Sequence, residues 1–246
     1  MYNFQDKIVA VTGAARGLGY AMAKRFMDDG AKAVAFLDLQ QEAAQKAADA
    51  LDPGGARSIA LACDVGNIKA VEAAFAQIDA RFGGVDVLVN NAGATKDGFA
   101  AKMSAEQFDF AVQVNLNGAF YCSRQVIPGM RERGWGRIIF LSSTSAFGNA
   151  GQANYSAAKA GLLGLTQTLC LELGPKNITV NCVAPGFIDT DIIKTVPEHV
   201  MADLLKRNPA GRLGQPEEVA NLVAFLASDQ AAFINGECIK ICGGMR

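Results

Sequence analysis

The sequence predicts an α/β fold: a single domain built on a doubly wound parallel sheet with helices on both faces. Short apolar, β-branched segments alternate with longer helical stretches along the whole chain, the pattern expected when helices connect parallel strands. Several strand segments are almost continuously apolar, as strands buried on both faces are. A length of 246 residues allows one or two domains. No linker, internal repeat or low-complexity segment divides the chain, so we expect one domain over residues 1–246.

Seven strands are expected, each from a short apolar run. In chain order they cover Lys7–Thr12, Ala33–Asp38, Ser58–Cys63, Val85–Asn90, Gly136–Leu141, Ile178–Ala184 and Glu237–Ile241. Between them the apolar spacing changes to a helical period. The helices expected there cover Ala21–Asp29, Gln41–Leu51, Ile68–Arg81, Ala105–Arg133 with a break near Asn115, and Asn154–Leu173. The first three end at glycine or proline, residues that stop a helix.

Composition excludes several classes of function. With 23 Lys+Arg against 24 Asp+Glu and no basic cluster, the chain lacks the charge of a nucleic-acid-binding protein. The first residues lack the order of a signal peptide, and no apolar stretch reaches the about 18 residues of a membrane-spanning helix. The six cysteines contain no Cys-x-x-Cys pair. No metal site is therefore expected, and the thiols are expected to be reduced in a cytoplasmic protein.

A glycine-rich turn, Thr12–Gly19, joins the first expected strand to the first helix. Gly13, Gly17 and Gly19 allow a sharp turn and bring backbone N–H groups against a pyrophosphate, while the helix N-terminus supplies positive potential. The position is that of the dinucleotide-binding turn of a Rossmann fold, but the spacing Gly-x-x-x-Gly-x-Gly differs from Gly-x-Gly-x-x-Gly. An ordinary glycine-rich turn therefore stays open at this point.

Asp38 ends the second strand about 20 residues after the glycine turn, where a carboxylate can accept hydrogen bonds from the adenosine ribose. A 2′-phosphate would meet a like charge there, and Leu39-Gln40-Gln41 offers no basic residue, so NAD(H) is favoured. Two alternatives remain. Asp38 could cap the following helix, and Arg16 could reach toward a phosphate, which keeps NADP(H) open.

Small or polar residues follow two further strands at the same edge of the sheet. Cys63-Asp64-Val65 follows the third strand, and Asn90-Asn91-Ala92-Gly93 follows the fourth. Ligands bind at the carboxyl ends of the strands in open α/β sheets. Each segment alone could be an ordinary loop, but together with the glycine turn they predict a cofactor site.

Tyr155 and Lys159 lie four residues apart, on one face of an expected helix. A phenol with a pKa of about 10 is a poor acid or base at neutral pH, and a neighbouring ammonium stabilises its phenolate. The pair is therefore a candidate acid/base centre, although tyrosine and lysine at this spacing often share a solvated face. Ser142, at the end of the fifth strand, adds a hydroxyl at the same edge of the sheet.

Taken together, these motifs resemble the short-chain dehydrogenase/reductase family over nearly the whole chain. Its Thr-Gly-x-x-x-Gly-x-Gly turn matches Thr12–Gly19, its Asn-Asn-Ala-Gly matches Asn90–Gly93, and its Tyr-x-x-x-Lys matches Tyr155–Lys159. Within the family the chain looks most like the 3-oxoacyl-[acyl-carrier-protein] reductases, on the segments Gly148–Tyr155, Val183–Thr190 and Ala210–Gly214.

The resemblance implies hydride transfer between a nicotinamide cofactor and a carbonyl or secondary alcohol. Tyr155 would exchange the proton. The family serine lies thirteen residues earlier, which selects Ser142 over Ser143, and would hydrogen-bond the same oxygen. Lys159 would bind the nicotinamide ribose and favour the phenolate, and Asn115 would hold a water that links Lys159 to solvent.

The same resemblance places residues 187–208 over the substrate, with His199 as an exposed residue of that segment; a surface helix is the alternative interpretation. It brings Ile188 and Thr190 to the nicotinamide carboxamide. The expected cofactor-binding residues are Gly13, Arg16, Gly17, Leu18, Gly19, Asp38, Asp64, Val65, Asn91, Ala92, Gly93, Tyr155, Lys159, Pro185, Gly186, Ile188 and Thr190.

Substrate and partners are implied less closely. The leading expectation is a 3-oxoacyl or 3-hydroxyacyl thioester, carried on acyl carrier protein or coenzyme A. Basic residues such as Arg131 and Lys176 could contact an acidic carrier but equally suit helix C-termini. The resemblance implies a homotetramer that packs through the helices Ala105–Arg133 and Asn154–Leu173 and the last strand. The resemblance also implies NADPH as the cofactor, whereas Asp38 departs from the residue pattern of NADPH-dependent enzymes.

Two alternative functions remain. One is an NAD-dependent dehydrogenase of another secondary alcohol, such as a sterol or a small cyclic alcohol. The other is a catalytically silent nucleotide-binding regulator, which the presence of Ser142, Tyr155 and Lys159 disfavours.

Overall fold

A computed structural model of the chain describes residues 2–190, 193, 201, 205–206 and 208–245. One parallel sheet runs through these residues, in the order β3-β2-β1-β4-β5-β6-β7. The seven predicted strands are confirmed, with ends that shift by one or two residues. They are β1 (Ile8–Thr12), β2 (Ala33–Asp38), β3 (Ser58–Ala62), β4 (Val87–Asn90), β5 (Gly136–Leu141), β6 (Ile178–Pro185) and β7 (Cys238–Ile241).

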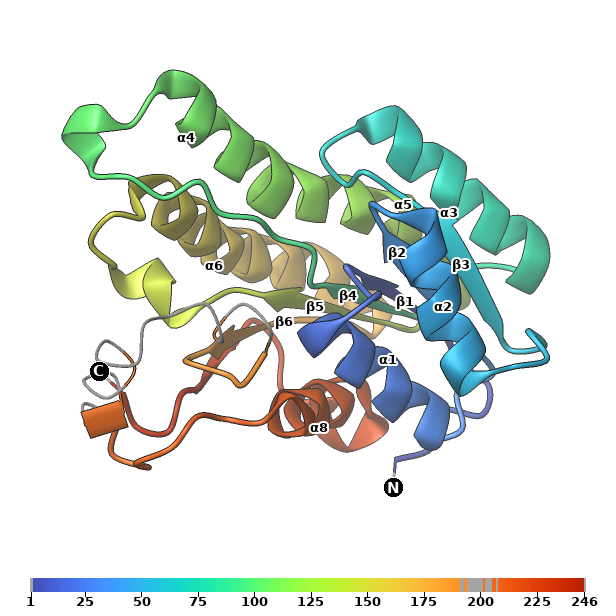
Figure 1. Cartoon of the computed structure of the whole chain (residues 1–246). Helices are drawn as coiled ribbons and strands as arrows, with labels where there is room; N and C mark the ends of the chain where they lie inside the picture. Colours follow the sequence, from blue (N-terminus) through green and yellow to red (C-terminus); the bar gives the residue numbers. More distant parts are fainter. Residues whose placement is uncertain (1, 191–192, 194–200, 202–204, 207, 246) are drawn as a thin grey trace.

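Helices cover both faces of the sheet, so the predicted α/β fold is confirmed as a three-layer Rossmann fold (Figure 1). The α-helices are α1 (Gly17–Asp28), α2 (Gln41–Leu51), α3 (Ile68–Phe82), α4 (Ala105–Val112), α5 (Gly118–Arg133), α6 (Ala153–Leu173) and α8 (Pro216–Ala227). Short 3-10 helices are η1 (Ala100–Lys102), η3 (Thr144–Phe147), η4 (Gly174–Lys176) and η6 (Asp229–Ala231).

The core lies on the two faces of the sheet because successive strand residues point to opposite sides. Val9 and Val11 of β1 belong to the apolar cluster under α1, α2 and α8, whereas Ile8 and Ala10 belong to the cluster under α3, α5 and α6. Every residue of β1 is buried. This explains the continuous apolar runs from which the strands were predicted.

The predicted interruption near Asn115 is a π-helical turn. Residues Gln113–Asn117 form one such turn, η2, between α4 and α5, and the backbone stays right-handed helical on both sides of it. The helical backbone therefore continues through this turn. The extra residue in the turn rotates Asn115 into the interior, where its side chain is buried, and π turns of this kind often occur at functional sites.

Among the residues that the structure describes, one α-helix was not predicted from the sequence. Helix α8 begins at Pro216 and carries a capping box, in which Gln215 and Glu218 each bond the other's backbone N–H. Proline at the first helical position and a glutamate two residues later were the available signals. Its buried residues, such as Val219 and Val223, pack on the same face of the sheet as α1.

The strand order creates a crevice at the centre of the sheet. Strand β1 pairs with β2 on one side and with β4 on the other, so the connections leave β1 and β4 in opposite directions. Ligands bind at such a switch point, beyond the carboxyl ends of the strands. In the parts of the chain that the structure describes, no helix has both the length and the hydropathy needed to cross a membrane.

Candidate active site

The glycine turn adopts the conformation that a dinucleotide requires. Gly13 and Gly17 have positive φ angles of 64° and 55°, and α1 begins at Gly17. At Gly19 a Cβ atom would overlap the carbonyl oxygen of Gly13 and lie 2.8 Å from Asn91 Nδ2. Glycine is therefore needed for the close approach between the helix and the turn. Leu18 packs against the core below, while Arg16 is exposed at the N-cap of α1.

Hydrogen bonds tie the glycine turn to the loop after β4. Thr12 Oγ1 accepts from the backbone N–H groups of Asn91 (3.0 Å) and Ala92 (2.9 Å). Asn91 Nδ2 donates in return to the carbonyl oxygens of Thr12 (2.9 Å) and Gly13 (3.2 Å). Two segments that the sequence predicted separately thus form one structure at the edge of the crevice.

The Asp38 carboxylate also lies against the glycine turn. Its Oδ2 accepts from the Ala15 N–H at 3.1 Å, while Oδ1 lies 3.4 Å from the Gln40 N–H. It is thus held beside the turn, where it can still accept further hydrogen bonds. Asp64, by contrast, accepts from the Gly66 N–H within its own loop at 2.9 Å, the arrangement of a loop cap. Val65 is buried beneath the start of α5.

Tyr155 and Lys159 stand on the first turns of α6, and burial shifts the pKa of both. Lys159 Nζ lies 5.5 Å from the Tyr155 ring centroid and donates to the Leu141 carbonyl oxygen at 2.7 Å. Burial raises the pKa of Tyr155 to about 12; a hydrogen bond from Ser143 opposes this, and the Asp97 carboxylate adds to it. Burial lowers the pKa of Lys159 to about 8. The phenol is therefore protonated at neutral pH.

Asn115 presents an unpaired acceptor next to this pair. Its Nδ2 donates to the carbonyl oxygens of Ala94 (2.7 Å) and Ala111 (2.8 Å), whereas its Oδ1 is buried without a hydrogen-bond partner. A Cβ atom on Gly93 would lie 2.6 Å from that oxygen and 3.4 Å from Lys159 Nζ. The missing Cβ leaves a small space between the amide oxygen and the ammonium. A buried polar atom of this kind is usually satisfied by water.

Two adjacent serines follow β5. Ser143 lowers the pKa of Tyr155 against the effect of burial, and its hydroxyl accepts from the Ser145 N–H at 3.1 Å. Ser142 continues the pairing of β5 with β6, and its buried hydroxyl donates to the backbone carbonyl of Lys159 at 2.9 Å. Ser142, the serine that the family spacing selects, thus bonds the same helix that carries Tyr155 and Lys159.

A polar network that the sequence did not predict borders Tyr155. Gln152 Nε2 donates to Asp97 Oδ2 at 2.9 Å, and Gln152 Oε1 accepts from Ser145 Oγ (3.0 Å) and Asn149 Nδ2 (2.8 Å). An isolated bridge between Gly98 and Gln152 holds the two loops together. The bridge joins segments far apart in the sequence, so no local pattern could reveal the network.

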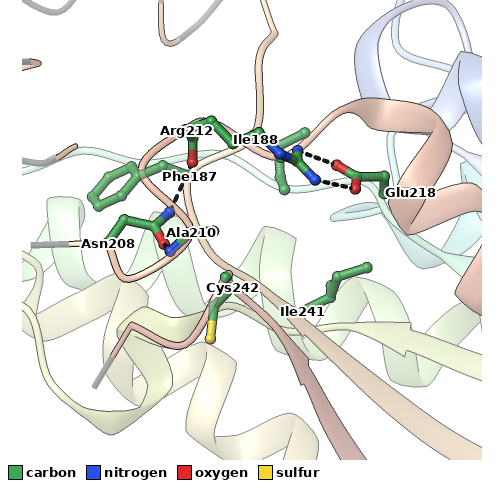
Figure 2. Close-up of a pocket in the computed structure, with 10 residues that line it drawn as sticks. Phe187, Ile188, Asn208, Ala210, Arg212, Glu218, Ile241 and Cys242 are labelled. Carbon is green, nitrogen blue, oxygen red and sulfur yellow. Dashed lines mark hydrogen bonds and ion pairs between the residues drawn. The ribbon is translucent and has the colours of Figure 1, made fainter.

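The first residues of the expected substrate-covering segment pair, beyond β6, with Gly214, which follows that segment. The Gly214 N–H donates to the Phe187 carbonyl (3.0 Å), and the Asp189 N–H donates to the Gly214 carbonyl (2.8 Å). A cavity of about 90 Å³ lies at this junction. Figure 2 shows residues that line it, with Arg212 paired to Glu218. Most of residues 187–208, including His199, lies outside the described residues.

The remaining predicted residues also lie near the crevice. Gly186 follows Pro185 at the end of β6, and its N–H donates to the Ile241 carbonyl at 3.0 Å. Ile188 is buried, and a methyl carbon of Thr190 would lie 3.8 Å from a Cβ on Gly17. These contacts join the segment after β6 to the glycine turn. The shaped turn, the held carboxylate and the unpaired Asn115 oxygen together fit an extended dinucleotide.

Comparison with known proteins agrees with this geometry. Residues 13–246 match the family model described as "Enoyl-(Acyl carrier protein) reductase". The chain is 43% identical to 3-oxoacyl-[acyl-carrier-protein] reductase FabG of Escherichia coli (strain K12) over 244 residues, 99% of this chain and 98% of the other. It is 41% identical to (2S)-[(R)-hydroxy(phenyl)methyl]succinyl-CoA dehydrogenase subunit BbsD of Thauera aromatica over 242 residues, 98% and 97% of the two chains. Nodulation protein G of Azospirillum brasilense is 41% identical over 241 residues, 98% of each chain. The chain therefore belongs to the short-chain dehydrogenase/reductase family and is a nicotinamide-dependent oxidoreductase that acts on CH–OH groups.

Proposed function

We propose that this chain interconverts a 3-oxoacyl thioester and the corresponding 3-hydroxyacyl thioester with NAD(H). The observation that carries the proposal is the cluster of Tyr155, Lys159 and Ser142 at the carboxyl edge of the sheet. A proton donor, a second hydroxyl and a cation in this arrangement suit a carbonyl oxygen that gains negative charge during reduction.

Each polar group would have a distinct role. When bound, the nicotinamide supplies the hydride. Tyr155 donates its proton to the carbonyl oxygen, and its raised pKa keeps that proton in place at neutral pH. Ser142 hydrogen-bonds the same oxygen, the role that the family spacing implies for it. Lys159 would bind the nicotinamide ribose hydroxyls, and a water on the free Asn115 oxygen would link Lys159 to solvent.

The cofactor preference rests on Asp38. Its carboxylate lies beside the glycine turn, where it would accept hydrogen bonds from a free adenosine ribose and repel a 2′-phosphate. Leu39, which follows it, is exposed and carries no charge to offset that repulsion. Arg16 is the one exposed cation within the turn itself, Thr12–Gly19. The net effect favours NAD(H) over NADP(H).

The substrate class rests on two relatives. One is named for reduction of a 3-oxoacyl group on acyl carrier protein, and the other for dehydrogenation of a hydroxyl-bearing acyl-CoA. Both names describe an acyl thioester that carries oxygen on its acyl chain. An NAD-dependent enzyme of this class would suit the oxidation of 3-hydroxyacyl thioesters as well as the reverse reaction.

Substrate cover and assembly are part of the same proposal. Residues 187–208 would close over the acyl chain, which the pairing of Phe187 and Asp189 with Gly214, just after that segment, supports. The active form would be a homotetramer, supported by exposed apolar side chains on α4, α5 and α6. The six free cysteines favour a reducing compartment such as the cytoplasm.

Steady-state kinetics of acetoacetyl thioester reduction, with NADH and NADPH side by side, test this proposal. Coenzyme A and acyl carrier protein serve as alternative carriers, and Asp38→Ser is the matched cofactor variant. We expect higher kcat/KM with NADH, and a relative gain with NADPH in the variant. A strong NADPH preference of the unmodified chain would refute the role of Asp38. Turnover of other alcohols alone would favour the second function, and nucleotide binding without any turnover would favour the regulator.

A further inference from the structure

The loop that follows β4 is tied at two points to the start of α6. Gly98 forms an isolated β-bridge with Gln152, the residue just before the helix. Asn154, which is buried and directly precedes Tyr155, donates from its Nδ2 to the Lys96 carbonyl oxygen at 2.9 Å. These contacts hold the loop beside the first turn of α6, which carries the proposed proton donor.

Asp97 lies between these two attachment points. Gln152 Nε2 donates to Asp97 Oδ2 at 2.9 Å, and within the described part of the chain no group donates to Oδ1. Gln152 is itself held in place, because its Oε1 accepts from Ser145 Oγ (3.0 Å) and Asn149 Nδ2 (2.8 Å). The carboxylate is therefore fixed in position by a neutral amide.

The negative charge of Asp97 is not neutralised by a neighbouring cation. No ion pair within the described residues includes this carboxylate. Lys96, the adjacent lysine, places its Nζ over the Phe110 ring at 4.1 Å. Asp97 is exposed to solvent, and an exposed aspartate is fully ionised at neutral pH. A fixed negative charge therefore stands beside the first turn of α6.

This charge acts on the position where the substrate reacts. After burial, which is the main cause, the Asp97 carboxylate also raises the pKa of Tyr155, because it opposes the phenolate. A substrate carbonyl must lie against the phenol to receive its proton. Any negative charge that the substrate carries close to that carbonyl is therefore opposed by the same carboxylate.

We propose that Asp97 selects against substrates that carry a negative charge beside the reacting carbonyl, and so favours 3-oxoacyl thioesters over free 3-oxo acids. The carboxylate of a free 3-oxo acid lies two carbon atoms from its ketone, whereas the same carbon of a thioester is uncharged. The preference for thioesters rests on the proposed function. The selection by charge applies to any ketone that the enzyme reduces.

Acetoacetate and ethyl acetoacetate are the probes, because they share one ketone and differ in charge. The measured quantity is the ratio of kcat/KM for the acid to kcat/KM for the ester, with NADH at neutral pH. In Asp97→Asn, whose amide oxygen can still accept from Gln152, we expect this ratio to rise about three- to tenfold. A general loss of turnover affects both ketones and leaves the ratio unchanged.

Salt provides a second readout of the same charge. In about 1 M salt the Debye length falls to about 3 Å, so an exposed carboxylate is largely screened. The ratio of the unmodified enzyme should therefore rise with salt, and the ratio of Asp97→Asn should rise less.

Asp49→Asn is the matched control. Asp49 is an exposed residue of α2 that accepts from Gln45 Nε2 at 2.8 Å, the same kind of bond at another place on the chain. Its ratio should equal that of the unmodified enzyme. An unchanged ratio in Asp97→Asn would overturn the proposal, even if both rates fell, because Asp97 would then have only a structural role.

A binding measurement covers ketones that react slowly. Calorimetric titration of both ketones into the complex of the enzyme with NAD⁺ gives the same ratio from dissociation constants. Failure of the proposed function has a different result: no turnover of acetoacetyl thioesters, together with a raised ratio in Asp97→Asn, refutes the thioester substrate and retains the selection by charge. A protein that neither binds nor reduces the two ketones would overturn the inference.

Discussion

At the scale of single residues, burial moves the pKa values of Tyr155 and Lys159 in opposite directions. The pKa of the Tyr155 phenol rises to about 12 and the pKa of the Lys159 ammonium falls to about 8, in both cases because burial disfavours the charged form. The proton on Tyr155 is therefore ready for reduction of a carbonyl but must first be lost before an alcohol can be oxidised. The direction of the reaction therefore determines how its rate depends on pH, because both directions use the proton of Tyr155.

This link predicts opposite pH dependence for the two directions. Below the pKa of Tyr155, the phenolate fraction increases about tenfold for each pH unit, so kcat/KM for alcohol oxidation should rise steadily from neutral to alkaline pH. Carbonyl reduction needs the protonated phenol and should change little over the same range. Rates measured in both directions in one buffer series check this. An oxidation rate that is flat from neutral pH upward would contradict it.

Replacing the phenol tests the same residue without changing pH. Tyr155→Phe should lower turnover by about 10²–10⁴-fold, the usual contribution of positioned proton transfer. The affinity for cofactor should stay similar, because the ring that packs at the site is retained. Tyr121→Phe, a half-buried tyrosine on α5, is the matched control and should keep full turnover. Retained turnover in Tyr155→Phe would remove Tyr155 from the mechanism.

The two adjacent serines should respond differently to loss of their hydroxyls. Ser142→Ala removes the hydroxyl that the family spacing assigns to the substrate oxygen, and with it a buried hydrogen bond to the Lys159 carbonyl. We expect a large fall in kcat and a loss of about 1 kcal/mol in the free energy of unfolding. Ser143→Ala is the matched control and should have a smaller effect on kcat. Turnover and urea unfolding of both variants decide the assignment, and a larger kcat loss in Ser143→Ala would contradict it.

The surroundings of Tyr155 also show where sequence reasoning stops. Tyr155 and Lys159 were predictable because their spacing of four residues places them on one helix face whatever the surroundings. The hydrogen bonds from Gln152 to Asp97 and from Ser145 to Gln152 were not predictable. They depend on the bridge between Gly98 and Gln152, which joins segments far apart in the sequence.

At the scale of elements, strands were predicted more completely than helices. Buried parallel strands are apolar throughout, so β1 and β6 could be read directly from composition. Helix α8 was missed although its capping box and first-turn proline are present in the sequence. The π turn at Asn115 was predicted only as an interruption, because its geometry depends on how α4 and the turn itself pack against α6 rather than on local propensity.

The junction of the glycine turn and α1 gives a prediction at this scale. In Gly19→Ala the added methyl would overlap the Gly13 carbonyl and approach Asn91, so the helix must move away from the turn. We expect a loss on the order of 1–3 kcal/mol in the free energy of unfolding, as in overpacked cores, together with much weaker cofactor binding. Urea unfolding and titration with NADH measure the two effects.

Gly54→Ala is the matched control for that substitution. Gly54 has no positive φ angle, and nothing lies within 4 Å of the position of its Cβ. A methyl group there should leave cofactor binding unchanged and alter stability by less than about 1 kcal/mol. If Gly19→Ala matched this control in both measurements, the close approach of α1 to the turn would have no functional role.

At the scale of the whole molecule, apolar side chains remain exposed on one set of elements. Phe108 of α4, Phe120 of α5 and Leu171 of α6 are exposed, and Phe233, just before β7, is fully exposed. Scattered exposed apolar residues are normal on a protein surface. These four, however, lie on or beside the elements that the resemblance to the family places between subunits. We therefore expect this surface to be covered in the assembled enzyme.

The assembly can be tested with one pair of leucines. Leu171 is 78% exposed on α6 and Leu39 is 69% exposed after β2, so they differ in location more than in exposure. Sedimentation of the unmodified protein should give a mass four times that of one chain, which is 25.8 kDa. Leu171→Lys should shift sedimentation toward smaller species, because a buried ammonium without a partner costs several kcal/mol, whereas Leu39→Lys should leave the mass unchanged.

A monomeric unmodified chain would refute the tetramer, and an intact tetramer in Leu171→Lys would place the contact away from α6. Because each 1.4 kcal/mol changes an association constant about tenfold, even partial burial of Leu171 should produce a measurable shift in dilute solution.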